Sequence, residues 1–455
     1  MIKKNILVVG GGFRGIVIAD KLKKSNNVDL IEKLPFIGGI LYSEEWNGFF
    51  IDKGIHIFDN TNDEDTKLIQ KILKNKFRKI SVKYGSRIND ITSSVVAIPD
   101  FTTLNKKTQM KIANELFECS FKNKKSKNLS EYLLNTYGKT AGKYYINLAK
   151  KYFAADPKEL SPDSHRNLPS RGRFFDDHIT SFLKNFKEFD YKLAMPTYND
   201  PMKWHNSVSD KSYRYFYPVK RGLREFCDNA EEYLKKEGIN VKTAVWITHL
   251  QQNKNKILCS MSDGSQTEYD NIVWTVDPIN LYKIITKQKM NINSGIHHVP
   301  MIVYYFIVDL KNINDFTYIQ DFTNKSIALR GAVTGMIGKQ IINNQTYVDV
   351  EVPTKITSKI WKNPDQFYDR IWEDIVKMGL VKGKLPKSKK YIKTPISFRA
   401  LKHNYKNKNI AIEKKIHKFS DKIFLINQED AQLFKILKSL KTKNNNTSSN
   451  LIKQK

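Results

Sequence analysis

A glycine-rich turn near the amino terminus constrains the fold of this chain more than any other feature. The stretch NILVVGGGFRGIVIADKL begins at Asn5, and Gly10, Gly12 and Gly15 within it fit the pattern G-x-G-x-x-G. Apolar residues before the turn are typical of a buried strand, and those after it recur at helical spacing. The first glycine bends the chain, the second lets backbone approach a pyrophosphate, and the third lets helix and strand pack closely. The sequence therefore predicts a βαβ unit whose helix amino terminus faces phosphates.

A second strand, NVDLIEK, carries Glu32 near its end, twenty positions after Gly12. At this position a carboxylate can accept hydrogen bonds from a ribose. The alternative is a purely structural βαβ unit in which Glu32 caps an exposed strand end. The turn, its flanking pattern and the acidic residue coincide, so we favour dinucleotide binding.

The bulk composition is that of a globular intracellular protein. The chain has 455 residues with 25 Phe and 22 Tyr, enough for two or three domains and a large core. The three cysteines, Cys119, Cys227 and Cys259, are isolated and have no CxxC spacing. They predict neither a disulfide framework nor a metal site, and they fit a reducing compartment.

The formal net charge of +31 is the most unusual bulk property. Such a charge can reflect an anionic substrate, an acidic membrane surface or nucleic acid. The lysines are spread along the whole chain among many Asn and Ile residues, which favours a general compositional bias. We place an anionic small-molecule substrate second and expect no nucleic-acid partner. The sequence leaves the oligomeric state open.

The apolar segments do not predict a membrane span. The longest run, MIVYYFIV from Met301 to Val308, is too short to cross a bilayer and is typical of a strand. The first strand begins by about residue 5, which leaves no room for a signal peptide. We expect a cytoplasmic protein, and peripheral membrane contact stays open.

Further elements follow along the chain. Helical patterns run from about 103 to 160, where Asn128 or Ser130 is suited to cap a helix, and again from Leu223 to Lys236. Strands dominate from about 301 to 351, and mostly helix follows to about 380. The polar, low-complexity tail, 441–455, is predicted to be disordered.

With these segments in order, the chain resembles the FAD-dependent amine oxidase clan, which includes protoporphyrinogen oxidases, phytoene desaturase-like enzymes and UDP-galactopyranose mutases. The closest match lies in the first sixty residues: the glycine turn, Glu32, the pair Gly38 and Gly39, and DKGIHIFD with His56. The resemblance implies that the turn binds the FAD pyrophosphate and that Glu32 binds the adenosine ribose. The segment with His56 would run beside the flavin.

A second match lies in the middle of the chain. YPVKRGLREFCDNAEEYLKKEGINVKTAVWITHL is similar to the oxidase and desaturase segment in which Pro and Gly precede a helix and a strand reaches the adenine. By this resemblance the backbone of Ile247 would meet the adenine ring. The stretch AADPKELS resembles the substrate-domain helices of the clan.

Two departures from the clan pattern concern the cofactor. Many of its oxidases place arginines on either side of the glycine pair, where this chain has Phe36 and Ile40. Backbone N–H groups and the helix dipole would then hold the pyrophosphate. The carboxyl-terminal signature has Asn427 where a glycine is expected, with Gln428 beside it.

The resemblance implies an α/β fold: a Rossmann-like FAD-binding domain of the GR2-type flavoproteins with an inserted mixed α+β substrate domain. We expect a discontinuous FAD domain formed by residues 1–95, 215–285 and 390–440. The substrate domain would comprise residues 96–214 and 286–389.

Candidate substrate residues are planar cations and aromatic rings, which suit phosphates and sugar or base rings. They are Arg171, Arg173, Tyr213, Arg214, Tyr215, Arg330 and Arg399. The leading hypothesis is an FAD-dependent oxidoreductase. Only one dinucleotide motif is present, which makes a two-nucleotide reductase less suitable and favours oxygen, or a substrate whose own bond is oxidised, for the second half of the reaction. A UDP-galactopyranose mutase-like isomerase of a nucleotide sugar is the first alternative. A non-catalytic, partner-binding protein similar to GDP-dissociation inhibitors is the second.

Overall fold

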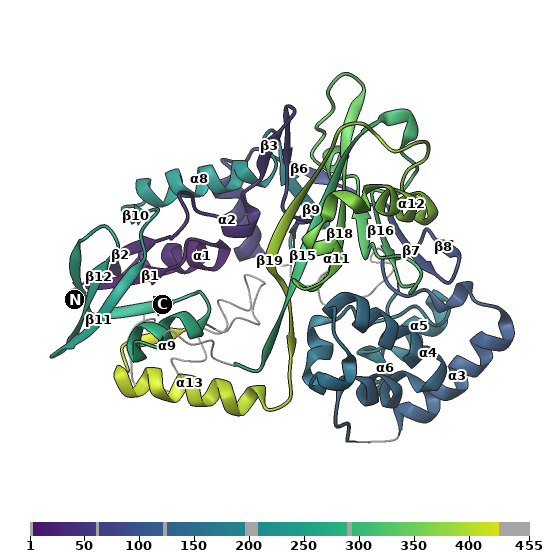
Figure 1. Cartoon of the computed structure of the whole chain (residues 1–455), viewed down its shortest axis with the longest axis horizontal. Coiled ribbons are helices and arrows are strands. Elements are labelled where there is room, and N and C mark those ends of the chain that lie inside the picture. The colour runs from purple at the N-terminus through teal and green to yellow at the C-terminus, as the bar shows by residue number, and fades with distance from the viewer. Residues whose placement is uncertain (1–2, 61–62, 122–124, 196–207, 289–293, 427–455) are drawn as a thin grey trace.

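The computed structural model describes residues 3–60, 63–121, 125–195, 208–288 and 294–426 (Figure 1). The predicted tail and the positions of Asn427 and Gln428 lie outside these residues. The α-helices of the described part are α1 Phe13–Leu22, α2 Asp63–Ile72, α3 Lys106–Ser120, α4 Leu129–Phe153, α5 Asp177–Leu183, α6 Lys187–Asp190, α8 Leu223–Lys236, α9 Pro278–Thr286, α10 Thr334–Ile337, α11 Lys359–Lys362, α12 Tyr368–Met378 and α13 Tyr405–Phe419.

The predicted βαβ unit forms the centre of a five-stranded parallel sheet. Its strand order is β10 Asn240–Lys242, β2 Asn26–Ile31, β1 Lys4–Val9, β14 Asn271–Trp274 and β20 Ile423–Leu425. Both faces of this sheet are covered. Ile6 and Val8 pack with α1, α2 and α8, whereas Leu7 and Val9 pack on the opposite side with α9 and α13. Burial on both faces explains why the strand is apolar without alternation.

A three-stranded antiparallel sheet helps to cover the second face. It consists of β11 Ile247–Asn253, β12 Lys256–Met261 and β13 Gln266–Tyr269. Two smaller sheets connect the layers. One pairs β3 Glu44–Trp46 with β4 Phe49–Ile51, and the other has the order β5 Phe58–Asp59, β9 Tyr215–Pro218, β6 Phe77–Ile80.

A seven-stranded sheet forms the second large unit, seen at the upper right of Figure 1. Its order is β19 Lys389–Leu401, β15 Ile296–Asp309, β18 Gln345–Pro353, β17 Arg330–Ala332, β16 Tyr318–Asp321, β7 Tyr84–Ile88 and β8 Ile91–Ser93. All neighbours are antiparallel except β16 and β7. One face packs against α12 through an apolar cluster that includes Tyr304, Val350 and Trp372. The other face meets β4.

Helices α3 to α6 gather at one end of the molecule, away from the parallel sheet (Figure 1). They share an apolar core in which the large side chains include Phe101, Tyr137 and Phe153. The Asn128 side chain accepts a hydrogen bond from the backbone N–H of Glu131, so Asn128 caps α4. Short 3-10 turns complete the chain: η1 Gly39–Leu41, η2 Phe101–Thr103, η3 Pro157–Glu159, η4 Pro162–Asn167, η5 Leu310–Asn312 and η6 Pro364–Phe367.

Some strands from segments expected in the FAD domain pair with strands from segments expected in the substrate domain. Strands β7 and β8 precede residue 95, yet they pair in the seven-stranded sheet, and β19 does so after residue 389. The long β15 forms backbone hydrogen bonds with β19 over most of its length, which holds β19 in this sheet. Among the described helices, α4 included, none combines the length and apolar character needed to cross a bilayer.

Candidate functional site

The glycine turn has the geometry of a phosphate-binding loop. Gly10 has φ +103°, and a Cβ at Gly15 would lie 1.8 Å from the Gly10 carbonyl oxygen, so strand and helix touch there. A Cβ at Gly12 would meet nothing within 4 Å. Gly12 is the N-cap of α1, and no side chain caps that helix. The N–H groups of the first turn lack intrahelical partners, so this open end suits an anion.

Glu32 and the glycine pair lie directly beside this turn. The Glu32 carboxylate accepts hydrogen bonds from the Gly11 N–H, at 2.7 Å, and from the Leu34 N–H, at 2.8 Å. Gly38 donates its N–H to the Gly11 carbonyl oxygen at 2.7 Å. We name Gly10, Gly12, Gly15, Glu32, Gly38 and Gly39 the dinucleotide cradle. Its open helix end and fixed carboxylate fit a dinucleotide's phosphates and ribose.

The strand expected at the adenine lies next to the cradle. The Val245 N–H donates to the Glu32 carbonyl oxygen at 2.9 Å, which fixes this segment beside the end of β2. Ile247 begins β11, where its side chain is 4 % exposed and packs in the core between sheet and helices. Its backbone contact with an adenine ring remains a prediction.

The seven-stranded sheet presents a row of polar side chains, most of them buried, toward the other unit. In register across four strands stand Ser86, Gln320, Arg330 and Glu351. Tyr318 and Asp349 lie two residues along on the same face. We name these six residues the polar face. Ser86, Gln320 and Asp349 are buried, and Ser86 Oγ, Gln320 Nε2 and both Asp349 oxygens lack hydrogen-bond partners. Unpaired buried polar atoms are rare in folded proteins, so this face suits a polar ligand.

Arg330 and Glu351 connect the polar face to the segment with His56. Arg330 Nε lies 2.6 Å from Glu351 Oε2, and Glu351 Oε1 accepts from the Ile55 N–H at 2.9 Å. Gly54 has φ +115°, and a Cβ there would lie 2.9 Å from Glu351 Oε1. Only glycine fits this approach.

His56 is held in the same place. Its Nδ1 lies 3.2 Å from the Gly54 carbonyl oxygen. Burial lowers the pKa of His56, the Glu351 carboxylate opposes this change, and the Arg330 guanidinium adds to it. A neutral imidazole at pH 7 therefore stands next to the polar face.

Two further buried carboxyls lie behind this group. Burial raises the pKa of Asp349 to about 8, and Glu351 and Asp52 add to the shift. Thr334 lies close enough to lower this pKa, but its hydroxyl group does not form a hydrogen bond with either Asp349 oxygen. Burial also raises the pKa of Asp52 to about 6, against hydrogen bonds from Ser43, Tyr217 and the Leu223 N–H. At neutral pH, Asp349 holds a proton in the folded protein.

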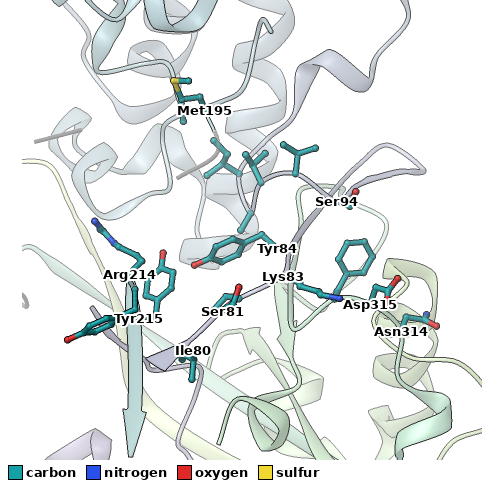
Figure 2. A pocket seen from close by; sticks show the side chains of 18 of the residues that line it. Ile80, Ser81, Lys83, Tyr84, Ser94, Met195, Arg214, Tyr215, Asn314 and Asp315 are labelled. Atoms are coloured by element: carbon teal, nitrogen blue, oxygen red, sulfur yellow. The ribbon is translucent and has the colours of Figure 1, made fainter. Parts of the chain in front are cut away.

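A large cavity opens beside the polar face (Figure 2). It has a volume of about 1730 Å³ and is lined by residues 79–84, 94–98, 194–195, 211–215 and 313–316, with Arg171, Gly379 and Lys382. Figure 2 shows Tyr84 between Arg214 and Tyr215 on one side and Lys83 on the other.

Aromatic rings connect this cavity with the polar face. The rings of Tyr84 and Tyr215 meet edge to face at 6.2 Å, and those of Tyr84 and Tyr318 at 5.7 Å. The Tyr318 hydroxyl lies 3.4 Å from Arg330 Nη1. The cavity therefore ends next to the Arg330–Glu351 pair.

The structure brings some of the predicted substrate residues together and separates others. Arg171, Tyr213, Arg214 and Tyr215 line the cavity, and Arg330 lies on the polar face behind it. Arg173 and Arg399 lie elsewhere. Arg173 Nη1 contacts Asp100 and Thr102, and its Nη2 lies 3.5 Å from Asp177. Burial lowers the pKa of Arg399 on β19, which stands in register with His298, and nearby Asp277 opposes the shift.

Sequence reasoning missed Glu351 and Asp349. Both lie in β18, whose sequence QTYVDVEVP alternates polar and apolar residues although almost every residue is buried. Charged residues at a two-residue period inside a buried strand must share one face. This pattern could have marked the polar face. The four-strand row of side chains could not be found in this way, because it depends on strand register.

Comparison with known proteins agrees with this architecture. Residues 8–74 match the family model for an NAD(P)-binding Rossmann-like domain. A search of curated protein sequences finds no significant match.

Solved structures similar to the whole chain include three enzymes. The structure of reduced UDP-galactopyranose mutase has TM-score 0.71 at 13% identity, covering 100% of this chain and 97% of the other. A putative protoporphyrinogen oxidase from Exiguobacterium sp. 255-15 has TM-score 0.66 at 14% identity, with coverage of 98% and 99%. Wild-type putrescine oxidase bound to putrescine has TM-score 0.63 at 10% identity, with coverage of 98% and 100%. The chain therefore contains an NAD(P)-binding Rossmann-like domain and has the fold of the FAD-dependent amine oxidase-like clan.

Proposed function

We propose that this protein is an FAD-dependent oxidoreductase that acts on a small-molecule substrate. One observation carries the proposal: the dinucleotide cradle and the polar face are joined by the segment that runs from Gly38 to His56, and the large cavity ends at that face. This arrangement has room for a long cofactor with its phosphates at one end and a reacting ring at the other.

The residues present fit FAD. The uncapped end of α1 and the open space at Gly12 would receive the pyrophosphate, and Glu32 would hold the adenosine ribose. His56 and the Arg330–Glu351 pair would lie at the ring end. Bound FAD would supply two-electron redox chemistry.

The chain's own groups would set the environment of that chemistry. The neutral His56 imidazole, whose Nδ1 faces the Gly54 carbonyl oxygen, keeps Nε2 able to accept a proton. Arg330, held by Glu351 and lying 5.6 Å from the Phe398 ring centre, would place a fixed positive charge where negative charge develops. The half-buried tyrosines Tyr84 and Tyr318 have pKa values raised by desolvation, so their hydroxyls remain proton donors. Oxygen would accept the electrons in the second half-reaction.

A mutase-like isomerase of a nucleotide sugar is the second candidate. The UDP-galactopyranose mutase structure covers almost all of both chains, which favours this alternative on fold alone. Such an enzyme would need reduced flavin and would cause no net oxidation.

The first experiment is an absorption spectrum of the purified protein, before and after dithionite, with the released cofactor identified by mass. We expect oxidised flavin bands that bleach on reduction and a mass equal to FAD. Oxygen consumption with candidate substrates would then distinguish an oxidase from an isomerase that is active only after reduction. A colourless protein that also fails to bind added FAD would sink both enzyme proposals and favour a partner-binding role.

The matched variant is Glu32→Gln. It keeps the size of the side chain but replaces the carboxylate, which would accept hydrogen bonds from the ribose hydroxyls, with a neutral amide. We expect about tenfold weaker FAD binding. Lys414→Gln on the exposed face of α13 serves as the control and should bind FAD as the parent does.

A further inference from the structure

The lining of the large cavity has a strong excess of positive charge. Its basic side chains are Lys79, Lys83, Arg171, Lys211, Arg214 and Lys382, and the one carboxylate in the described lining is Asp315. Two of these cations have acidic partners: Lys79 lies 3.0 Å from Asp210, and Arg214 lies 2.7 Å from Asp59.

The other four cations have no ion pair in the described structure. Lys83, Lys211 and Lys382 are exposed at the rim, and Arg171 is half-buried. Clefts lined by one sign of charge concentrate ligands of the opposite sign. A lining with this excess of positive charge favours anionic ligands over amines.

The interior of the same cavity is apolar and aromatic. Its apolar lining includes Ile80, Val82, Val96, Ile98, Met195 and Phe316. The tyrosine rings of Tyr84 and Tyr215 form the inner end, next to Tyr318 of the polar face. A volume of about 1730 Å³ exceeds what most drug-sized ligands need, which is about 300–1,000 Å³. Polar sugars would leave this apolar surface without a suitable partner.

We infer that the cavity binds an amphipathic anion: an extended alkyl or ring body that enters the apolar interior and carries a carboxylate or phosphate held at the basic rim. This inference rests on the proposed function, because it names the substrate class of that site. The apolar body would reach Tyr84 and the polar face, where oxidation would occur. Such an oxidation would remove two electrons and two protons across a carbon–carbon or carbon–heteroatom bond of the body, leaving a double bond. Bound FAD would accept the two electrons, and oxygen would then take up these electrons and two protons to give hydrogen peroxide.

The experiment is isothermal titration of the FAD-loaded protein with four probes below their micellar concentrations. Dodecanoate and dodecyl phosphate test the two anionic head groups, dodecyltrimethylammonium tests a cation on the same alkyl chain, and UDP tests a polar anion. We expect at least one of the two dodecyl anions to bind, and the anion with the higher affinity identifies the preferred head group. Binding of the cation with equal affinity, or of UDP more tightly than either dodecyl anion, would overturn the inference.

Matched variants locate the binding. The double variant Lys83→Gln with Arg171→Gln should weaken binding of the dodecyl anion by about tenfold. The control, Lys236→Gln with Lys414→Gln, removes the same charge from exposed positions on α8 and α13 and should leave affinity unchanged. Equal losses in both double variants would show that net charge, and not the cavity, attracts the anion, and would refute the inference.

A third variant keeps the test independent of charge. Ala97→Trp places a large ring in the cavity lining and should abolish binding of the dodecyl anions. FAD content and melting temperature are measured on every sample. Protein that holds FAD but binds neither dodecyl anion refutes only this inference, whereas protein that binds the anion without retaining FAD refutes the proposed function.

Discussion

The dinucleotide cradle is made mainly of backbone, whereas the polar face is made of side chains. In the cradle, glycines leave room at Gly12 and allow the close contact between Gly15 and Gly10, and the one essential side chain is that of Glu32. On the polar face, Arg330 pairs with the buried Glu351 carboxylate, beside Ser86 Oγ, Gln320 Nε2 and the Asp349 oxygens, which lack hydrogen-bond partners. The cradle therefore depends on the space that glycines leave for the backbone and a ligand, whereas the polar face depends on the charged and polar groups that its side chains supply.

The largest expected effect comes from filling the tightest point of the cradle. A Cβ at Gly15 would lie 1.8 Å from a backbone oxygen, which cannot move aside as a flexible side chain would. We expect Gly15→Val to lower the free energy of unfolding by more than about 3 kcal/mol, as overpacking with a backbone shift does. Urea denaturation followed by circular dichroism measures the change.

Gly12→Ala is the matched control for this prediction. Gly12 has φ −68°, which any residue adopts, and its added methyl group would meet no protein atom within 4 Å. Stability without cofactor should stay within about 0.5 kcal/mol of the parent, while FAD affinity falls. If both variants lost stability equally, the open space at Gly12 would not be a ligand position.

The next effect tests the side-chain character of the polar face. Arg330→Met leaves the Glu351 carboxylate buried and without its cation, since the Glu351 side chain is only 4% exposed. We expect a loss of about 3 kcal/mol, typical of breaking a buried pair. The double variant Arg330→Met with Glu351→Leu should recover most of it, and a double-mutant cycle measured by denaturation checks this. A single variant as stable as the parent would contradict a buried ion pair here.

A smaller effect concerns the proton held by Asp349. Its pKa is about 8 in the folded protein and 3.8 as a reference, so folding takes up a proton between about pH 4 and pH 8. The stability that this carboxyl contributes is present below about pH 4 and is lost as pH rises toward 8. Each pH unit inside this window is worth about 1.4 kcal/mol, so Asp349→Asn should match the parent near pH 4 and exceed its stability by about 2 kcal/mol near pH 5.5.

Denaturation of parent and variant at several pH values measures this difference directly. Asp52, whose pKa is also raised by burial and which adds to the shift of Asp349, is present in both proteins. A constant difference between pH 4 and pH 8 would show that Asp349 does not hold its proton in the folded state.

The smallest effect lies outside both regions. Asn128 caps α4 through its hydrogen bond from the Glu131 N–H, so Asn128→Ala should cost about 1 kcal/mol. FAD content and affinity should not change, because α4 belongs to the helical group away from the cradle (Figure 1). Thermal unfolding with an FAD assay checks both statements, and a change in FAD affinity would show that the two regions are coupled.

The sequence by itself determined the first half of this site. The turn at Gly10 to Gly15, the strand that ends near Glu32 and the pair Gly38–Gly39 are close in the chain, and their backbone conformations follow from local residue types. The helix over Leu223–Lys236 and the cap at Asn128 are confirmed for the same reason.

Only the tertiary structure decided the other half. Ser86 comes from β7, whereas Gln320, Arg330 and Glu351 come from three strands more than 200 residues later in the chain. They form one row because strand register places them opposite one another. A shift of one residue in any strand would turn its side chain to the opposite face. The same dependence explains why Arg173 and Arg399, chosen by residue type, lie away from the cavity, whereas the unremarked Glu351 pairs with Arg330 on the polar face. Local chemistry specifies a backbone turn, but a surface assembled from distant side chains exists only once the sheets have formed.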